Sequence, residues 1–247
     1  MSIGAGVEHL LADDLLPAHV PIVRMVQPDM TQRMTEYVLQ HVLAHHRRAR
    51  CLADAQMRKA WLVLDQPSAR ERCVGILGLG RLGATAAQAL TPLGFDVWGW
   101  SRTPKSIPGI QSETGSAGLE TVLKKAEILV CLLPLTAETT GLLNADTLRL
   151  LPPGASVINA ARGPIIVDGD LLAVIDQSHI REATLDAFSV EPLPQDHPFW
   201  THPKITVTPH NASAVTRDAL AYRLIAVVET VRSGLRPEPV VDRTRGY

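Results

Sequence analysis

Arg162, Glu191 and His210 each follow a run of small or apolar residues that is typical of a buried strand. A guanidinium presents a fork that matches a carboxylate, and an imidazole can donate a proton near neutral pH. A carboxylate beside the imidazole favours its protonated form and orients the ring. Together the three side chains could hold a 2-oxo acid and protonate its ketone oxygen when hydride reaches the carbon. Taken singly, each also has a structural explanation: a surface turn, a capping acid or a buried, hydrogen-bonded ring.

A glycine motif lies upstream of these residues. Gly78, Gly80 and Gly83 form the pattern G-x-G-x-x-G, with Arg81 and Leu82 inside it. The pattern follows one predicted strand and begins a predicted helix, which is the context that a dinucleotide site requires. The first glycine permits a tight turn, the second lets the backbone approach a pyrophosphate, and the third allows close helix packing. The motif therefore predicts a dinucleotide site rather than a merely glycine-rich turn.

The residues after the second predicted strand indicate which dinucleotide binds. An acidic residue there would bind the ribose 2′-hydroxyl and repel a 2′-phosphate. The strand is followed instead by Ser101 and Arg102. A hydroxyl and a guanidinium suit a phosphate, so the sequence predicts NADP, with NADPH preferred to NADH. A solvated basic turn is the alternative.

The elements that must position these residues alternate regularly from residue 72 onward. Strands are predicted at residues 73–77, 95–100, 128–132, 155–159, 183–186 and 205–208. Helices are predicted at residues 82–93, 119–125, 144–150 and 168–176. Most strands are apolar without alternation, which is typical of strands buried on both faces of a parallel sheet. The pattern predicts an α/β, doubly wound Rossmann fold, in which polar residues after the strands converge at one edge.

Two long helices flank this region. The first is predicted at residues 31–50, with Met34 and Val38 on its apolar face, and the second at residues 211–233, where Gly234 can end it. Residues 21–25 are predicted to form one further strand.

Composition excludes several classes of protein. The 247 residues are 46% hydrophobic and 20% charged with a net charge of -1, which predicts an ordered globular protein that attracts neither nucleic acid nor an anionic membrane. No apolar run approaches the ~20 residues that span a bilayer, and the N-terminus shows no signal peptide. Three scattered cysteines predict reduced thiols in the cytoplasm and no zinc site. We interpret His45 and His46 as part of a solvated helix end rather than a metal or nucleic-acid site.

Five motifs in order resemble those of the D-2-hydroxyacid dehydrogenases, and the resemblance covers the whole chain. They lie at residues 78–83, 131–141, 159–163, 186–194 and 208–210. Within that family, residues 4–9, 100–102 and 241–247 are similar to the NADP-preferring glyoxylate/hydroxypyruvate reductases. The resemblance implies NADPH-dependent reduction of glyoxylate to glycolate and of hydroxypyruvate to D-glycerate. It implies Arg162, Glu191 and His210 as the catalytic residues.

The same resemblance implies further roles. It places the cofactor beside the glycine motif and beside Leu133, Pro134 and Ala160, and it makes Asp186 a partner of the nicotinamide carboxamide. It assigns the backbone amides of three residues to the substrate carboxylate: Ala5, Gly6 and Val7. An arm that ends near Trp61 would embrace a second subunit of a homodimer. Packing of Trp61 in its own core is the alternative.

The resemblance also suggests a division of the chain. Residues 1–26 would be the remnant of a flavodoxin-like substrate domain. Residues 27–212 would be the NAD(P)-binding domain with a dimerisation helix and arm at 31–61, and residues 213–247 would return to the substrate domain. Family members precede the 4–7 loop with several strands and helices, so we expect an incomplete substrate domain. The chain should then bind NADPH but reduce glyoxylate poorly unless upstream sequence is restored.

Two other kinds of function share parts of this pattern. A nucleotide-sensing interaction protein could keep this fold for binding alone, as some relatives do in transcriptional corepression, and steady NADPH oxidation with glyoxylate would discriminate. A formate dehydrogenase should carry an amide at Glu191, and a phosphoglycerate dehydrogenase an acid at Ser101. Neither fits this sequence.

Overall fold

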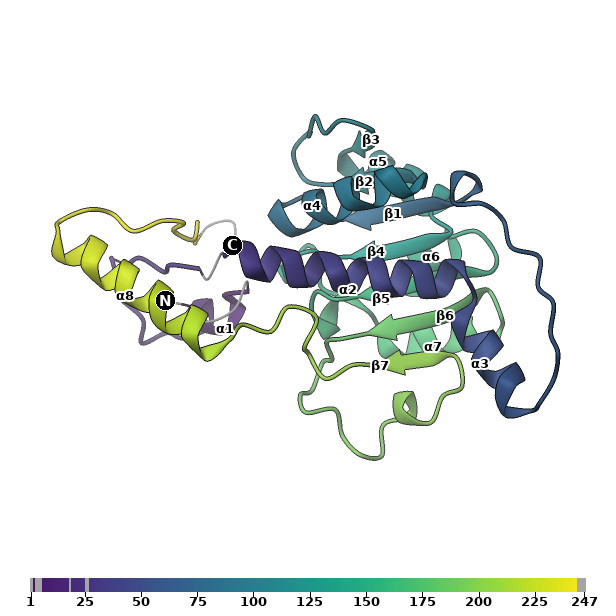
Figure 1. Ribbon diagram of the computed structural model, residues 1–247. Coiled ribbons are helices and arrows are strands. Elements are labelled where there is room, and N and C mark those ends of the chain that lie inside the picture. The colour runs from purple at the N-terminus through teal and green to yellow at the C-terminus, as the bar shows by residue number, and fades with distance from the viewer. Residues whose placement is uncertain (1, 3–5, 18, 25–26, 244–247) are drawn as a thin grey trace.

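The apolar runs from residue 73 onward form one parallel sheet in the computed structural model, which describes residues 2, 6–17, 19–24 and 27–243 (Figure 1). Its strands are β1 Cys73–Leu77, β2 Asp96–Trp100, β3 Ile110–Glu113, β4 Ile128–Cys131, β5 Ala155–Asn159, β6 Ile180–Leu185 and β7 Ile205–Val207. Their order is β3-β2-β1-β4-β5-β6-β7, and every neighbouring pair is parallel. This order, with its switch between β1 and β4, confirms the doubly wound fold.

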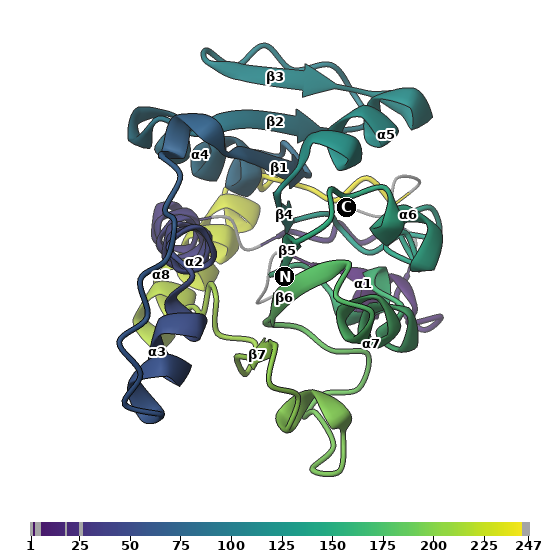
Figure 2. The same ribbon diagram turned by 90° about the vertical axis from the view of Figure 1, so that its right-hand side faces the viewer.

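Helices cover both faces of the sheet, as Figure 2 shows. On one face lie α2 Pro28–His46 and α4 Arg81–Leu90; on the other lie α5 Gly115–Lys125, α6 Ala145–Arg149 and α7 Asp168–Asp176. Every residue of β4 and β5 is buried between these layers. This burial explains why the central strands are continuously apolar.

The sequence prediction missed β3. Its four residues, Ile110–Glu113, include only one buried side chain, and the strand pairs with β2 alone at the edge of the sheet. A short, mostly polar edge strand carries little hydrophobic signal. Two other starts were also wrong: the strand predicted at 183–186 begins at Ile180, and the helix predicted at 119–125 begins at Gly115.

The single helix predicted at residues 31–50 is two helices. The first, α2, begins at Pro28, where proline suits the first helical turn, and ends at His46. Arg48 then adopts a left-handed backbone with φ of 55°, and α3 Ala49–Met57 follows in a new direction. Because the break contains neither glycine nor proline, local stop signals were absent from the sequence.

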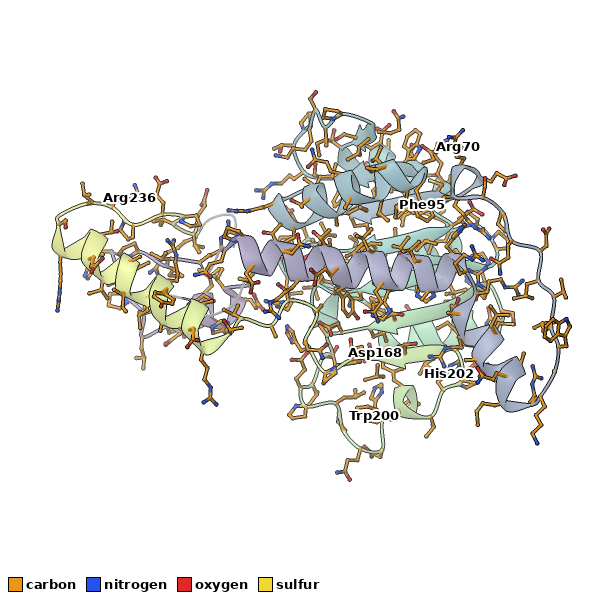
Figure 3. The ribbon with its side chains drawn as sticks, in the orientation of Figure 1. Arg70, Phe95, Asp168, Trp200, His202 and Arg236 are labelled. Atoms are coloured by element: carbon orange, nitrogen blue, oxygen red, sulfur yellow. The ribbon has the colours of Figure 1, made fainter. Side chains whose placement is uncertain are left out.

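The interpretation of His45 and His46 as a solvated helix end was wrong. Their exposed fractions are 4% and 5% because the end of α2 packs against the sheet. The two ring nitrogens of His45 lie 3.1 Å from Glu182 Oε1 and 3.0 Å from Thr184 Oγ1, both on β6. His46 packs edge-on against Phe95, which Figure 3 labels near the C-terminal end of α2, with ring centroids 5.1 Å apart.

An outer segment, residues 6–17, 19–24 and 217–243, lies beyond the carboxyl ends of the strands (Figure 1). It contains α1 Glu8–Leu11 and α8 Arg217–Arg232. Its two halves meet through an antiparallel bridge between Val23 and Val240 and a small apolar cluster. In place of the strand predicted at 21–25 there is only this isolated bridge, and Met25 lies outside the described residues.

The last helix, α8, begins six residues later than predicted. Thr216 caps it by accepting a hydrogen bond from the Ala219 amide, and residues 211–216 form a loop instead. Gly234, with φ of 73°, follows the helix end as predicted. None of the residues of α8 is buried, and the chain continues past it to Arg236 (Figure 3).

Candidate active site

The glycine motif links β1 to α4, and its three glycines meet different surroundings. Gly78 has φ of 106°, which favours glycine, and its amide donates to the Trp100 carbonyl at 2.8 Å. A Cβ on Gly83 would lie 2.0 Å from the Gly78 carbonyl oxygen. A Cβ on Gly80 would meet nothing within 4 Å. Gly83 therefore serves packing, whereas Gly80 borders an open cradle at the N-terminus of α4, where Arg81 and Leu82 begin the helix.

Because Gly83 is closely packed and Gly80 is not, we expect alanine substitutions at the two positions to have different effects. Gly83→Ala should destabilise the fold by about 1–3 kcal/mol, because its methyl group must displace backbone. Gly80→Ala should leave the unfolding midpoint unchanged and weaken dinucleotide binding, because its methyl group occupies the cradle. Thermal unfolding without cofactor and fluorescence titration with NADPH measure the two effects. Equal destabilisation by both substitutions would contradict the assignment.

Two loops after neighbouring strands border the same cradle. The Leu132 carbonyl oxygen lies 2.7 Å from the position of a Cβ on Gly78, so the chain into Leu133 and Pro134 passes directly beside the motif. The amide of Ala160 donates to the Cys131 carbonyl at 3.3 Å, which places it on the adjoining loop. The structure thus brings the three residues from the sequence prediction to the end of the sheet that carries the glycine motif.

Ser101 and Arg102 form a turn directly after β2. The Ser101 amide donates to the Glu113 carbonyl at 3.1 Å, and its buried hydroxyl donates to the Thr103 carbonyl at 2.8 Å. Arg102 is exposed at the tip of this turn. Because β2 pairs with β1, the turn lies beside the glycine motif, where a ribose phosphate would be expected.

His210 and Glu191 form a hydrogen-bonded pair. His210 Nδ1 lies 2.7 Å from Glu191 Oε2, and Glu191 Oε1 accepts a bond from the Phe188 amide at 2.9 Å. Because a carboxylate only accepts, Nδ1 carries the proton of this bond, and Nε2 is the nitrogen that can serve a reactant. The His210 side chain is nearly half exposed, with 46% of its surface accessible. The pair can therefore present an oriented imidazole to a ligand.

Arg162 is held at the end of β5 by its own loop. Asn159 accepts from the Ala161 amide at 3.1 Å and donates to the Arg162 carbonyl at 3.0 Å, which fixes the turn. Arg162 Nη1 donates to the Ala161 carbonyl at 2.7 Å. A Cβ on Gly163 would lie 1.9 Å from the Phe188 backbone, so this loop touches the one that leads to Glu191. The role of Asn159 was not predicted, although an amide at the end of a buried strand was a visible signal.

The outer segment reaches Arg162 through the 6–8 loop. Glu8 pairs with Arg162 Nε, and a Cβ on Gly6 would lie 1.9 Å from Arg162 Nη2, so a larger residue at this position would displace the guanidinium. Burial acts to raise the pKa of the Glu8 carboxyl, but the hydrogen bond to Arg162, a backbone hydrogen bond and the charges of Arg162 and His9 together outweigh it, so the pKa lies below its usual value. Val7 is buried beside Glu8, and Ala5 lies outside the described residues. The sequence did not predict this contact of Glu8.

Asp186 anchors the loop that carries His210. Its carboxylate is 2% exposed and accepts from Thr208 Oγ1 at 2.6 Å and from the amides of Asn211 and Ala212, each at 3.0 Å. Sequence reasoning assigned Asp186 to a cofactor but missed its hold on this loop. The residues that make these bonds are distant from Asp186 in sequence, so no local pattern indicated them.

The alternative of core packing for Trp61 was wrong, since the side chain is 97% exposed. Across the described part of the chain, no group of three or more His, Cys, Asp or Glu side chains is placed to hold a metal ion. None of its helices has the length and apolar character needed to cross a membrane.

The chain is similar in sequence to known proteins. Residues 39–212 match the model of the D-isomer specific 2-hydroxyacid dehydrogenase NAD binding domain. The chain is 41% identical over 251 residues to glyoxylate/hydroxypyruvate reductase A of Serratia proteamaculans, matching 100% of this chain and 80% of that protein.

Two crystal structures are similar over nearly the whole chain. A D-isomer specific 2-hydroxyacid dehydrogenase from Xanthobacter autotrophicus, in complex with NADPH and MES, has a TM-score of 0.94 and 44% identity, covering 98% of this chain and 100% of that one. An NADPH-dependent glyoxylate/hydroxypyruvate reductase from Sinorhizobium meliloti, in complex with NADP and sulfate, has a TM-score of 0.95 and 39% identity, covering 99% of this chain and 78% of that one.

Proposed function

Because this chain belongs to the D-isomer specific 2-hydroxyacid dehydrogenase family, we propose that it uses NADPH to reduce glyoxylate to glycolate and hydroxypyruvate to D-glycerate. The observation that carries the proposal is the hydrogen bond between His210 and Glu191. The pair follows β6 and β7 at the sheet edge where Arg162 follows β5. A proton donor and a carboxylate-binding cation are the two groups that reduction of a 2-oxo acid needs from the protein.

The cradle fits NADP. The open space beside Gly80 can admit a pyrophosphate at the N-terminus of α4, where backbone amides and the helix dipole favour anions. The exposed guanidinium of Arg102 can bind the 2′-phosphate. Asp186 Oδ1 accepts two of the three hydrogen bonds and Oδ2 accepts one, so Oδ2 can accept another. This supports the proposed role of Asp186 toward the nicotinamide carboxamide. The bound cofactor supplies the hydride for the keto carbon.

The side chains of the protein bind the negative charge of the substrate and supply the proton for its ketone oxygen. Arg162, with the amides of Gly6 and Val7 and with Ala5, binds the substrate carboxylate and polarises the ketone. Glu8 holds the Nε edge of Arg162 and so orients its fork. His210 donates the proton on Nε2 to the oxygen as it becomes an alkoxide, while Glu191 steadies the resulting ring through Nδ1. Carbon gains the hydride and oxygen gains the proton, giving the 2-hydroxy acid.

The activity is tested directly by following NADPH and NADH absorbance with a panel of 2-oxo acids. We expect slow but measurable turnover with glyoxylate and hydroxypyruvate, and a preference for NADPH. Tight NADPH binding without turnover of any 2-oxo acid would overturn the proposal and favour a nucleotide-binding interaction protein.

Cofactor preference should depend on Arg102. We expect Arg102→Ala to weaken NADPH binding by about tenfold, the loss of a charge-assisted hydrogen bond, and to leave NADH binding unchanged because NADH lacks the 2′-phosphate. Fluorescence titration with both cofactors measures this. Arg232→Ala, at the exposed end of α8, is the matched control. Equal losses for NADPH and NADH would remove Arg102 from this role.

We also propose that the chain forms a homodimer through α3 and the arm that follows it. Met57, Trp61 and Val63 are all strongly exposed there, an apolar set that favours burial against another protein surface. Light scattering at micromolar concentration measures the mass. A monomer at all concentrations would contradict this assembly.

We further propose the division into residues 1–26, 27–212 and 213–247, with the first and last together forming the part that binds the substrate. The bridge between Val23 and Val240 and the hydrogen bonds of Arg243 to the carbonyls of Pro17 and Val20 support this grouping. Three free cysteines favour a reducing compartment such as the cytosol.

A further inference from the structure

His210 has a backbone conformation that must be imposed by its surroundings. Its φ is 51°, in the left-handed region, which costs a residue other than glycine about 1 kcal/mol or more. The orientation of its imidazole depends on this conformation, because the backbone sets the direction of the side chain. Contacts around residues 208–212 must therefore hold the loop in place.

A single buried carboxylate supplies those contacts. Asp186 accepts from Thr208, two residues before His210, and from the amides of Asn211 and Ala212, directly after it. Both sides of His210 are thus tied to one rigid point at the end of β6. A shift of Asp186 or Thr208 would move the imidazole.

The chain of bonds continues to α2. The Tyr37 hydroxyl lies 2.8 Å from Thr208 Oγ1. Since the Asp186 carboxylate only accepts, the one hydroxyl proton of Thr208 is donated to it, and Tyr37 must donate to Thr208. Burial raises the pKa of the Tyr37 phenol well above its ordinary value, which keeps this donor protonated.

Tyr37 is itself firmly placed. It lies on the face of α2 that packs against the sheet, next to Val38, which is fully buried. A phenylalanine would fill the same apolar space, so packing alone does not explain the hydroxyl. The bond to Thr208 gives the hydroxyl a use.

We propose that Tyr37 is a positioning residue for the reduction, which acts through Thr208 and Asp186 to hold the His210 loop; the proposal rests on the function proposed above. In this way α2, which packs on one face of the sheet, fixes the orientation of the His210 imidazole. Tyr37 need not touch substrate or cofactor to do so.

The test compares single-turnover NADPH oxidation in four variants. Tyr37→Phe should lower the rate about 3- to 10-fold, the worth of one neutral hydrogen bond, with the NADPH dissociation constant unchanged. Thr208→Val should lower it more, while Thr208→Ser, which keeps the hydroxyl, should stay within about threefold of wild type. Tyr222→Phe removes the hydroxyl of a tyrosine that is 75% exposed and should change nothing.

The double variant separates this role from general loosening of the fold. Because Tyr37 acts through the Thr208 hydroxyl, Tyr37→Phe combined with Thr208→Val should be no slower than Thr208→Val alone. Hydrogen exchange gives a readout besides activity: the Asn211 and Ala212 amides should exchange several-fold faster in Tyr37→Phe.

Unchanged rate and exchange in Tyr37→Phe, or losses that multiply in the double variant, would overturn the proposal. If the wild-type chain reduces no 2-oxo acid, the proposed function fails on its own. The exchange rates around His210 still decide whether Tyr37 holds the loop.

Discussion

His210→Asn is expected to lower the turnover of 2-oxo acids by about 10²- to 10⁴-fold, the usual contribution of a general acid, while NADPH binding persists. Asparagine is a suitable replacement because it tolerates a left-handed backbone better than most residues, so φ near 51° can be retained. The loss then reports the missing proton donor rather than a disturbed loop. Initial rates with saturating NADPH, together with a cofactor titration, measure it.

His19→Asn is the matched control, because His19 lies in an exposed turn of the outer segment. Its turnover should equal that of the wild type. Glu191→Gln keeps an oxygen that can accept a hydrogen bond from Nδ1–H, so its loss of turnover should be smaller than that of His210→Asn. Turnover within a few-fold of wild type in His210→Asn would exclude the imidazole as the proton donor.

The second large effect is expected from Arg162→Lys. A guanidinium can donate hydrogen bonds from several nitrogens at once. The ammonium of lysine is a single point charge and cannot form the same bidentate contact. Arg162 binds Glu8 through Nε and keeps other nitrogens for a substrate, whereas the single ammonium of a lysine cannot reach both. Losing one or two charge-assisted bonds should reduce kcat/KM for glyoxylate about 10- to 10³-fold.

The measurement is the dependence of initial rate on glyoxylate concentration, with the NADPH dissociation constant determined separately. We expect cofactor binding to be unchanged, because Arg162 contacts the 6–8 loop rather than the glycine motif. Arg149→Lys is the control: Arg149 bonds Gln177 at the exposed surface and should tolerate the change. A kcat/KM within threefold of wild type would show that the fork is dispensable.

Several elements of the fold and the glycine motif can be predicted from local sequence patterns. The bounds of β1, β5 and α7 agree with the sequence prediction. The apolar runs and the helical periodicity that indicate these elements are formed by residues close together in the chain. The glycine motif is equally local: Gly78 and Gly83 meet each other across one turn. The sequence also indicated that polar residues after successive strands share an edge, since parallel strands all end there.

Other features depended on the tertiary structure. The break at Arg48 contains no glycine or proline from which it could be predicted. The strand β3 is too short and too polar to give a hydrophobic signal in the sequence. His45 becomes buried only because the end of α2 packs against the sheet, where Glu182 of β6 pairs with its ring.

The contacts around the candidate active site are longer in range still. Glu8 meets Arg162 across 154 positions, and Tyr37 meets Thr208 across 171. The residue types at these positions were visible in the sequence, but their partners were not. Hydrogen bonds act over about 3 Å, and only the folded chain brings side chains so distant in sequence within that range.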